Sequence, residues 1–256
     1  MSFVICNLSL VICHLSLLFF LCIKLKIMLD QVPFWLIAMF IGITLATYIG
    51  LLMSLMFGGE RVQRRLHIVA LVVLAWIIFQ SALSLNRWYM DREAMPPHLV
   101  FPVATMLVII SLLFLTSRGR RFVDGLSPMV LTLIHVIRIP VEISLYWLAF
   151  YKQVPWSMTF YGHNFDIIFG ITAPFIAYFG VYKKKLSPAI IKGWNVLGLI
   201  SLLIIVVTAF GAAPSPLQAW DFNQPNYAVL HFPFTWLPSF IVPIVLFAHL
   251  KGILRK

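Results

Sequence analysis

Long apolar runs, separated by short polar or basic stretches, dominate the sequence. Several of these runs approach or exceed the roughly 18 residues that a helix needs to cross a bilayer. The pattern predicts an all-α integral membrane protein, a bundle of seven transmembrane helices. The predicted helices cover residues 33–58, 67–86, 99–116, 129–151, 164–182, 194–211 and 234–250.

Composition supports this fold class. Hydrophobic residues make up 62% of the chain and charged residues 11%. An average soluble domain is about 45–50% apolar and about 25% charged. We therefore expect the lipid bilayer to be the main surrounding partner of this chain.

Most of the basic residues lie in alternate loops, although the chain as a whole has a net charge of +11. Thirteen Lys and Arg residues follow the first, third, fifth and seventh predicted helices, and three follow the others. Because basic loops stay on the cytoplasmic side, this predicts an N-terminus outside and a C-terminus inside. No basic helix, zinc-ligand spacing or aromatic sheet pattern indicates nucleic-acid binding.

The first segment, residues 1–27, is a doubtful part of the protein. Residues 4–10 read VICNLSL and residues 11–17 read VICHLSL, a tandem repeat with one difference. The segment lacks a basic start and a small-residue cleavage site, so it is a poor signal peptide. Its two lysines would also lie outside, against the charge rule. We expect translated upstream repeat DNA and a seven-helix domain over 28–256 that starts at Met28; a genuine extra helix is the alternative.

One predicted helix, residues 129–151, carries ionisable residues inside its apolar run. At 100° per residue, His135, Arg138, Glu142 and Tyr146 fall within an arc of about 80°. A charge in the hydrocarbon costs about 2.5–3.5 kcal/mol on insertion scales, and such residues usually face a protein interior or a water-filled cavity. This stripe is therefore the candidate polar core of the bundle.

Two interpretations of the stripe remain open. In the first, Arg138 and Glu142 form an i,i+4 ion pair that only fixes the packing of helices. In the second, they form a relay for protons or a site for a carboxylate or phosphate, which the fork of an arginine suits. His135 would then titrate near neutral pH. Pro140 predicts a kink or a free carbonyl next to this group.

A second polar group lies toward the predicted outer side. Gln80, on the outer half of the second helix, is a candidate member of the polar core. Asn164, Asp166, Asp221 and His231 are candidates for an outward mouth. The competing interpretations are helix capping for the first two of these, a solvated loop for the last two, and interhelical hydrogen bonding for Gln80.

Several kinds of site are excluded by missing residues. The helix at 234–250 has no lysine for a retinal Schiff base, and the chain has no HExxH, GxSxG or P-loop motif. The three cysteines, Cys6, Cys13 and Cys22, show no metal-ligand spacing. We expect His249 to lie at the membrane interface. No metal and no cofactor are therefore expected.

Three stretches carry a resemblance to a known family. They read HVIRIPVEISLYW from residue 135, MTFYGHNFDIIFGITAPFIAYFG from residue 158 and NQPNYAVLHFPFTWLPSFIVPIVLF from residue 223. With these stretches the chain resembles a family of uncharacterised bacterial multi-pass membrane proteins, from Met28 to the C-terminus. The resemblance implies a place in the bacterial inner (cytoplasmic) membrane and a start near Met28, but it implies no activity.

Three functions fit these observations. The first is small-solute or proton-coupled transport or binding, with a small anionic or lipid ligand at the polar core. The second is an intramembrane enzyme acting on a lipid or isoprenoid, with Glu142 or Asp166 as acid–base group and Arg138 as oxyanion partner. The third is a sensor or structural partner protein. The lack of a catalytic motif favours a non-enzymatic role, and the sequence leaves the oligomeric state open.

Overall fold

A computed structural model of the chain describes residues 31–162 and 164–254, which form helices and no β-strand. The doubtful segment 1–27 lies outside the described residues. Five helical segments are long and apolar enough to cross a membrane. They are α2 (Phe34–Met56), α4 (Leu66–Leu85), α7 to α8 (Pro128–Phe150), α10 (Pro188–Gly211) and the last segment, Leu237–Leu254.

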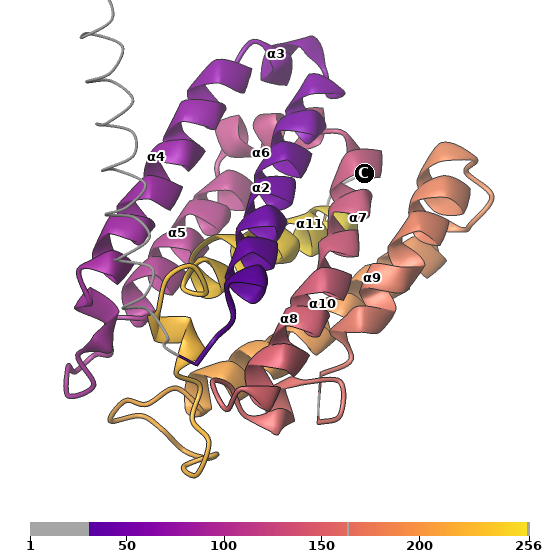
Figure 1. The fold of residues 1–256 in the computed structure, drawn as a ribbon. Helices are drawn as coiled ribbons and strands as arrows, with labels where there is room; N and C mark the ends of the chain where they lie inside the picture. The colour runs from indigo at the N-terminus through magenta and orange to yellow at the C-terminus, as the bar shows by residue number, and fades with distance from the viewer. Residues whose placement is uncertain (1–30, 163, 255–256) are drawn as a thin grey trace, which may run out of the picture.

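Two further segments complete the set of predicted helices. α5 (Val100–Leu115) and α6 (Ser117–Gly125) meet at an angle of 91° and count as a sixth span if they are taken together. α9 (Asp166–Phe175) continues into η4 (Ile176–Tyr182) as a shorter apolar helix. In Figure 1 this helix and the first part of α10 form an arm on the right, and the two elements pack on each other.

The helices run between two ends of the molecule. At one end, the N–H of Gly59 donates to the carbonyl of Gly125 (2.8 Å) and the N–H of Ser127 donates to that of Ser54 (2.9 Å). We call this the basic end, because the arginines of segments 57–65 and 117–127 lie there. Figure 1 shows α3 (Glu60–Gln63) joining α2 and α4 at the top of the view.

The opposite end is built from the longer connections. The N–H of Ala228 donates to the carbonyl of Gln153 (3.0 Å), and Nε2 of Gln224 donates to that of Val154 (2.6 Å). We call this the loop end; it contains residues 151–162 and 212–233. The chain therefore alternates between the two ends in consecutive helices.

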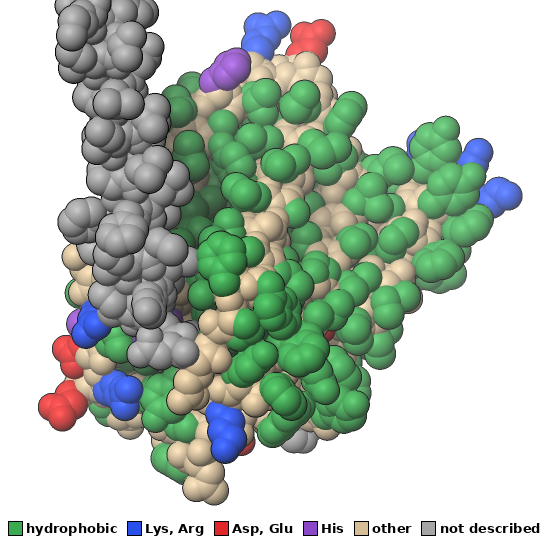
Figure 2. Space-filling model, viewed as in Figure 1, with side chains coloured by type: hydrophobic (Ala, Val, Ile, Leu, Met, Phe, Trp, Pro, Cys, Tyr) green, Lys and Arg blue, Asp and Glu red, His purple; other side chains and the backbone are tan. Residues whose placement is uncertain are grey.

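The outer surface between the two ends is apolar. Ile68, Leu71, Val72 and Ile78 of α4 each expose more than half of their surface. Figure 2 shows hydrophobic side chains covering the middle of the molecule, with charged side chains near its margins. A belt of this kind is what lipid chains require, and together with the five apolar spans it fits a helical membrane protein.

Prolines coincide with departures from the α-helix in three segments. A 3₁₀ turn, η2 (His135–Ile137), separates α7 (Pro128–Ile134) from α8 (Arg138–Phe150), two residues before Pro140. Pro174 precedes the π-helical η4, and Pro238 lies in the π-helical η6 (Leu237–Ile241), which leads into α11 (Val242–Leu254). Because proline has no N–H, the regular i→i−4 ladder cannot continue through it. The helix is thus interrupted near Pro140 by a 3₁₀ turn, while Pro128–Phe150 continues as one span.

Two predicted boundaries were wrong. The stretch Ser117–Arg121, expected to be a loop, begins α6, because the hydroxyl of Thr116 caps it by accepting from the N–H of Gly119 (3.1 Å). The sixth predicted helix begins at Pro188 and not at residue 194, because Ser187 caps it. Short helices complete the described chain: α3 (Glu60–Gln63), η1 (Trp88–Met90), η3 (Trp156–Met158) and η5 (Ala228–Leu230).

Gly119 should control the sharp bend between α5 and α6. A Cβ there would lie 2.5 Å from the carbonyl oxygen of Leu113 and 2.6 Å from its Cα. Because these are backbone atoms, we expect Gly119→Ala to lower stability by about 1–3 kcal/mol, the usual cost of overpacking. SDS-titration unfolding in mixed micelles measures this loss.

Gly193→Ala in α10 is the matched control, since a Cβ there meets no atom within 4 Å. The control should be neutral or slightly stabilising, because alanine favours a helix over glycine. Equal unfolding midpoints for the two variants would contradict the role given to Gly119.

Candidate functional site

An ion pair between Arg138 and Asp166 lies inside the bundle. Nε of Arg138 donates to Oδ2 of Asp166 (3.1 Å), and Nη2 lies 2.8 Å from Oδ1. The exposed fractions of the two residues are 3% and 6%. Such a two-point contact is the strong geometry for a guanidinium and a carboxylate.

This pair corrects the expected ion pair between Arg138 and Glu142. Asp166 is the first residue of α9, where the exposed N–H groups of a helix stabilise a negative charge. Its carboxylate also approaches Arg138 from a neighbouring helix and contacts two guanidinium nitrogens. Glu142, one turn along the same helix as Arg138, bonds elsewhere.

All three guanidinium nitrogens of Arg138 have a partner. Nη1 donates to Nε2 of His249 (2.9 Å), and Nη2 donates to the carbonyl of Gly198 (3.2 Å). The ring of Phe169 lies 5.3 Å from Cζ, a cation–π distance. The guanidinium is therefore held from α9, α10 and α11 at once.

His249 is held in one tautomer by its two neighbours. Because its Nε2 accepts from Arg138, the proton belongs on Nδ1, which donates to Oδ1 of Asn195 (3.0 Å). Nδ2 of Asn195 donates to the carbonyl of Ile191 (2.9 Å), which leaves its oxygen facing the ring. The expectation that His249 is interfacial was wrong, since its exposed fraction is 0%.

Asn164 connects the two acids. Its Oδ1 accepts from the N–H of Asp166 (3.1 Å), and its Nδ2 donates to the carbonyl of Met158 (3.0 Å) and to Oε1 of Glu142. The hydroxyl of Ser201 donates to Oδ1 of Asp166 (2.6 Å). Asp166 therefore has bonded partners on both oxygens.

Two buried polar atoms at the ends of this network have no hydrogen-bond partner. They are Oε2 of Glu142 and Nδ1 of His135, and each residue exposes 1% of its surface. The ring of His135 stacks on that of His249, with centroids 3.9 Å apart and planes 29° apart. A buried polar atom without a partner is costly. We call the whole network the polar core: His135, Arg138, Glu142, Asn164, Asp166, Asn195, Ser201 and His249.

Sequence reasoning missed the members of the polar core that come from α10 and α11. Asn195, Gly198 and Ser201 are spaced i, i+3 and i+6 on α10, so they share one face. A Cβ on Gly198 would collide with the ring of His249. This polar and small-residue face is the signal that could have indicated a partner for Arg138.

Gln80 and Tyr146 lie outside the polar core. The hydroxyl of Tyr89 donates to Oε1 of Gln80, whose Nε2 has no partner. Burial raises the pKa of Tyr89, so the phenol stays neutral and remains a donor. Tyr146 is half-buried in an aromatic cluster, with its ring 5.5 Å from that of Phe160 and 5.7 Å from that of Trp156.

The four residues expected at an outward mouth are separated. Asn164 and Asp166 are buried in the polar core, whereas Asp221 and His231 lie at the loop end. Asp221 accepts from the hydroxyl of Ser157 (2.6 Å). Nδ1 of His231 donates to the carbonyl of Tyr227 (2.8 Å), and burial lowers its pKa, so the ring is neutral at neutral pH.

The described residues bring no three His, Cys, Asp or Glu side chains together as a metal site would need. The polar core contains two acids and two histidines. However, Asp166 is already paired with Arg138, and Glu142 already accepts a hydrogen bond from Asn164. These residues hold a buried ion pair, and the acids and histidines among them are groups that can bind or release a proton.

Comparison with known proteins finds one family. Residues 94–255 match a domain of unknown function, DUF8737. The match contains every residue of the polar core, whereas α2 and α4 precede it. No curated protein and no solved structure matches the chain. Because the match covers more than half of the sequence, the chain belongs to the DUF8737 family.

Proposed function

We propose that this protein couples the binding of a proton in the polar core to the transport or binding of a small solute. One observation carries the proposal: Glu142 is a buried acid with one oxygen, Oε2, that no group contacts by a hydrogen bond. A carboxylate in that position is strongly disfavoured, whereas a protonated carboxyl there is neutral. Glu142 is thus the natural proton acceptor of the site.

The proposal includes seven spans in the bacterial inner membrane, with the N-terminus outside and the C-terminus inside. The alternation of the helices between the basic end and the loop end supports it, since the basic end would face the cytoplasm. α5 has only 16 residues, and the bend into α6 would place α6 along the interface. His135 would then lie on the inner side of Arg138, and Glu142 on the outer side.

The length of the polar core, and the sequence of bonded groups along it, suit a proton relay. His135 and Glu142 are seven residues apart, about 10 Å along a helix axis. Between them lie the bonded groups of Asn164, Asp166, Arg138 and His249. Protonation of Glu142 would change its bond to Asn164, and through it the contact with Asp166. A proton could thus alter the packing of α8 against α9.

The same geometry weakens the other two candidates. A small anion or an enzyme's oxyanion would have to displace Asp166 from Arg138, because the guanidinium has no free fork for a second carboxylate or phosphate. A sensor or structural partner protein would use the basic end to contact another protein. An enzyme with Glu142 as its acid–base group would use the same unpartnered oxygen, but its oxyanion partner, Arg138, is already occupied by Asp166; a sensor or structural role gives that oxygen no task.

Glu142→Gln should abolish proton coupling. We expect reconstituted parent protein to accelerate the decay of an imposed proton gradient when a transported solute is present, as read by an internal pH-sensitive dye. A panel of small organic anions, cations and neutral solutes would be tested. In Glu142→Gln the rate should fall to that of empty vesicles, because glutamine cannot release a proton.

Glu60→Gln is the matched control, since Glu60 lies on the surface in a weak 3.5 Å pair with Arg64. Infrared difference spectra between acidic and alkaline buffer should also show a protonated-carboxyl band that Glu142→Gln removes and Glu60→Gln keeps. Persistence of the band in Glu142→Gln, or equal proton fluxes in parent and Glu142→Gln, would overturn the proposal.

The ion pair itself should govern stability. Arg138→Leu leaves the charge of Asp166 buried and unpaired, which typically costs about 3–5 kcal/mol. Asp166→Asn added to Arg138→Leu should recover part of this loss, because the stranded charge is gone. Unfolding by SDS in mixed micelles measures all three proteins.

Arg64→Leu serves as the comparison, because exposed pairs contribute about 0–1 kcal/mol. If Arg138→Leu unfolded at the same SDS concentration as the parent, the buried pair would not be what holds α8 and α9 together. A double variant less stable than Arg138→Leu would show that the unpaired charge is not the source of the loss.

A further inference from the structure

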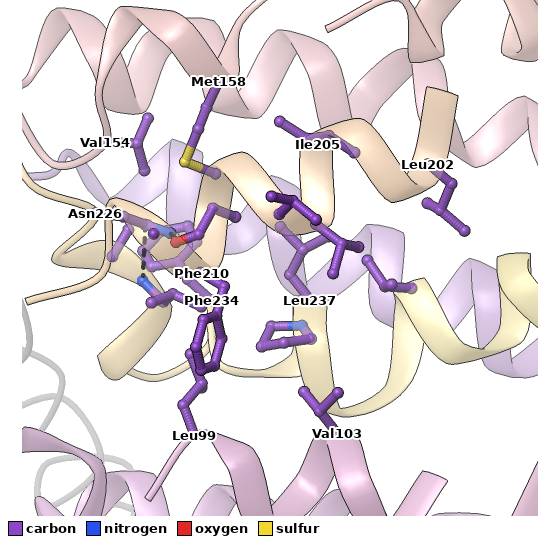
Figure 3. Close-up of a pocket in the computed structure, with 18 of the residues that line it drawn as sticks. Leu99, Val103, Val154, Met158, Leu202, Ile205, Phe210, Asn226, Phe234 and Leu237 are labelled. Carbon is purple, nitrogen blue, oxygen red and sulfur yellow. Dashed lines mark hydrogen bonds between the residues drawn. The ribbon is translucent and has the colours of Figure 1, made fainter. Parts of the chain in front are cut away.

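A cavity of about 460 Å³ lies apart from the polar core, between α5, α10 and the η6–α11 segment. Figure 3 shows its wall, with Val103 from α5, Leu202 and Ile205 from α10, and Leu237 from η6 pointing inward. Its volume falls in the range of about 300–1,000 Å³ that is usual for small-molecule sites. None of the polar-core residues lines it.

The wall of this cavity is almost entirely apolar. Among the described residues that form it, the one polar side chain is Asn226, and none is titratable. Nδ2 of Asn226 donates to the carbonyl of Ala209 (3.2 Å), and its Oδ1 accepts from the N–H of Val229 (3.4 Å). The cavity therefore offers nothing to a polar solute and no acid or base to a reacting one. A molecule that fills it would have to be a hydrocarbon.

The cavity opens sideways, toward the surface that faces lipid. Leu107 of α5 and Leu203 and Val207 of α10 belong to its wall, yet they expose 47%, 49% and 59% of their surface. α5 and α10 both pack on the η6–α11 segment, which forms the floor between them. The entrance thus lies between two helices of the apolar belt, where the neighbouring molecules in a bilayer are lipid acyl chains.

The loop end of the cavity is marked by Trp220. Its ring packs against the bare backbone of Gly211, and its Nε1 donates to the carbonyl of Thr208 (3.0 Å). Trp220 exposes 40% of its surface and belongs to the cavity wall. Tryptophan is typical of the level of lipid head groups, so a chain that enters beside it can leave its head group at the interface.

From the lateral opening, the apolar wall and this interfacial end, we propose that the cavity holds one acyl chain of a bilayer phospholipid. The chain enters between α5 and α10, and the head group stays outside near Trp220. A lipid chain leaving the bilayer gains no hydrophobic free energy. It gains close packing contacts with the wall, so binding depends on how well the chain fills the cavity. The inference is independent of the proton-coupled function.

Photocrosslinking of the full chain tests the site. The protein is reconstituted in phosphatidylcholine vesicles that contain a little phosphatidylcholine with a diazirine on one acyl chain. After illumination, adducts are mapped by mass spectrometry, with the exposed face of α4 as the reference for lipid at the surface. We expect adducts on cavity residues such as Met106 and Leu202. Val206→Phe should lower the yield of these adducts several-fold, relative to the yield of adducts on α4.

Val196→Phe is the matched control, since Val196 is on α10 but does not line the cavity. If Val206→Phe fails to fold, Leu203→Trp and its control Leu197→Trp replace the pair, because both leucines are exposed on α10. Cavity adducts that are absent, or equal in the filled and control variants, overturn the inference. Labelling by a free diazirine fatty acid but not by the phospholipid overturns the assignment to a bilayer phospholipid.

Discussion

The ion pair between Arg138 and Asp166 is the constraint around which the bundle is arranged. Two charges in a hydrocarbon interior are tolerated only when nearly every donor and acceptor has a partner. The guanidinium therefore requires a carboxylate at the start of α9, a carbonyl from α10 and an imidazole from α11. Those requirements fix how four helices approach one another. Placing the imidazole of His249 beside Arg138 also requires a glycine at position 198, because a side chain there would occupy the space of His249.

The sequence predicts the helices of this fold well because their signal lies within each segment. An apolar run of sufficient length is a property of one stretch of chain, and all seven predicted segments are helical in the structure. Caps are also local: Ser127 caps α7, which begins at Pro128, and Ser187 caps α10, which begins at Pro188. The start of α10 lies directly after a lysine-rich stretch, so the hydropathy pattern places it too late. The bend at Thr116 depends on a backbone contact that no hydropathy pattern contains.

The candidate site was predictable only in part. Arg138 and Glu142 stand out because charges are rare in apolar runs, and their helix is indeed at the centre. Their partners could not be derived, because a partner is chosen by packing between helices. A histidine near the end of the last segment looks interfacial in a linear sequence, yet His249 is the ring nearest to Arg138. The sequence predicted Asp166 as a helix start or as part of an outward mouth, whereas it serves as both a helix start and the counter-ion of Arg138.

One helix belongs to both sites of the molecule. Ser201 of α10 reaches the ionic centre, while the next residue, Leu202, forms part of the hydrocarbon-lined hollow. Neighbouring residues on a helix are rigidly joined, so any sliding or rotation of α10 moves both side chains together. If an acyl chain fills the hollow, its length and its saturation would act on the same helix that holds Ser201 beside the ion pair. The composition of the host membrane would then bear on the ionic centre.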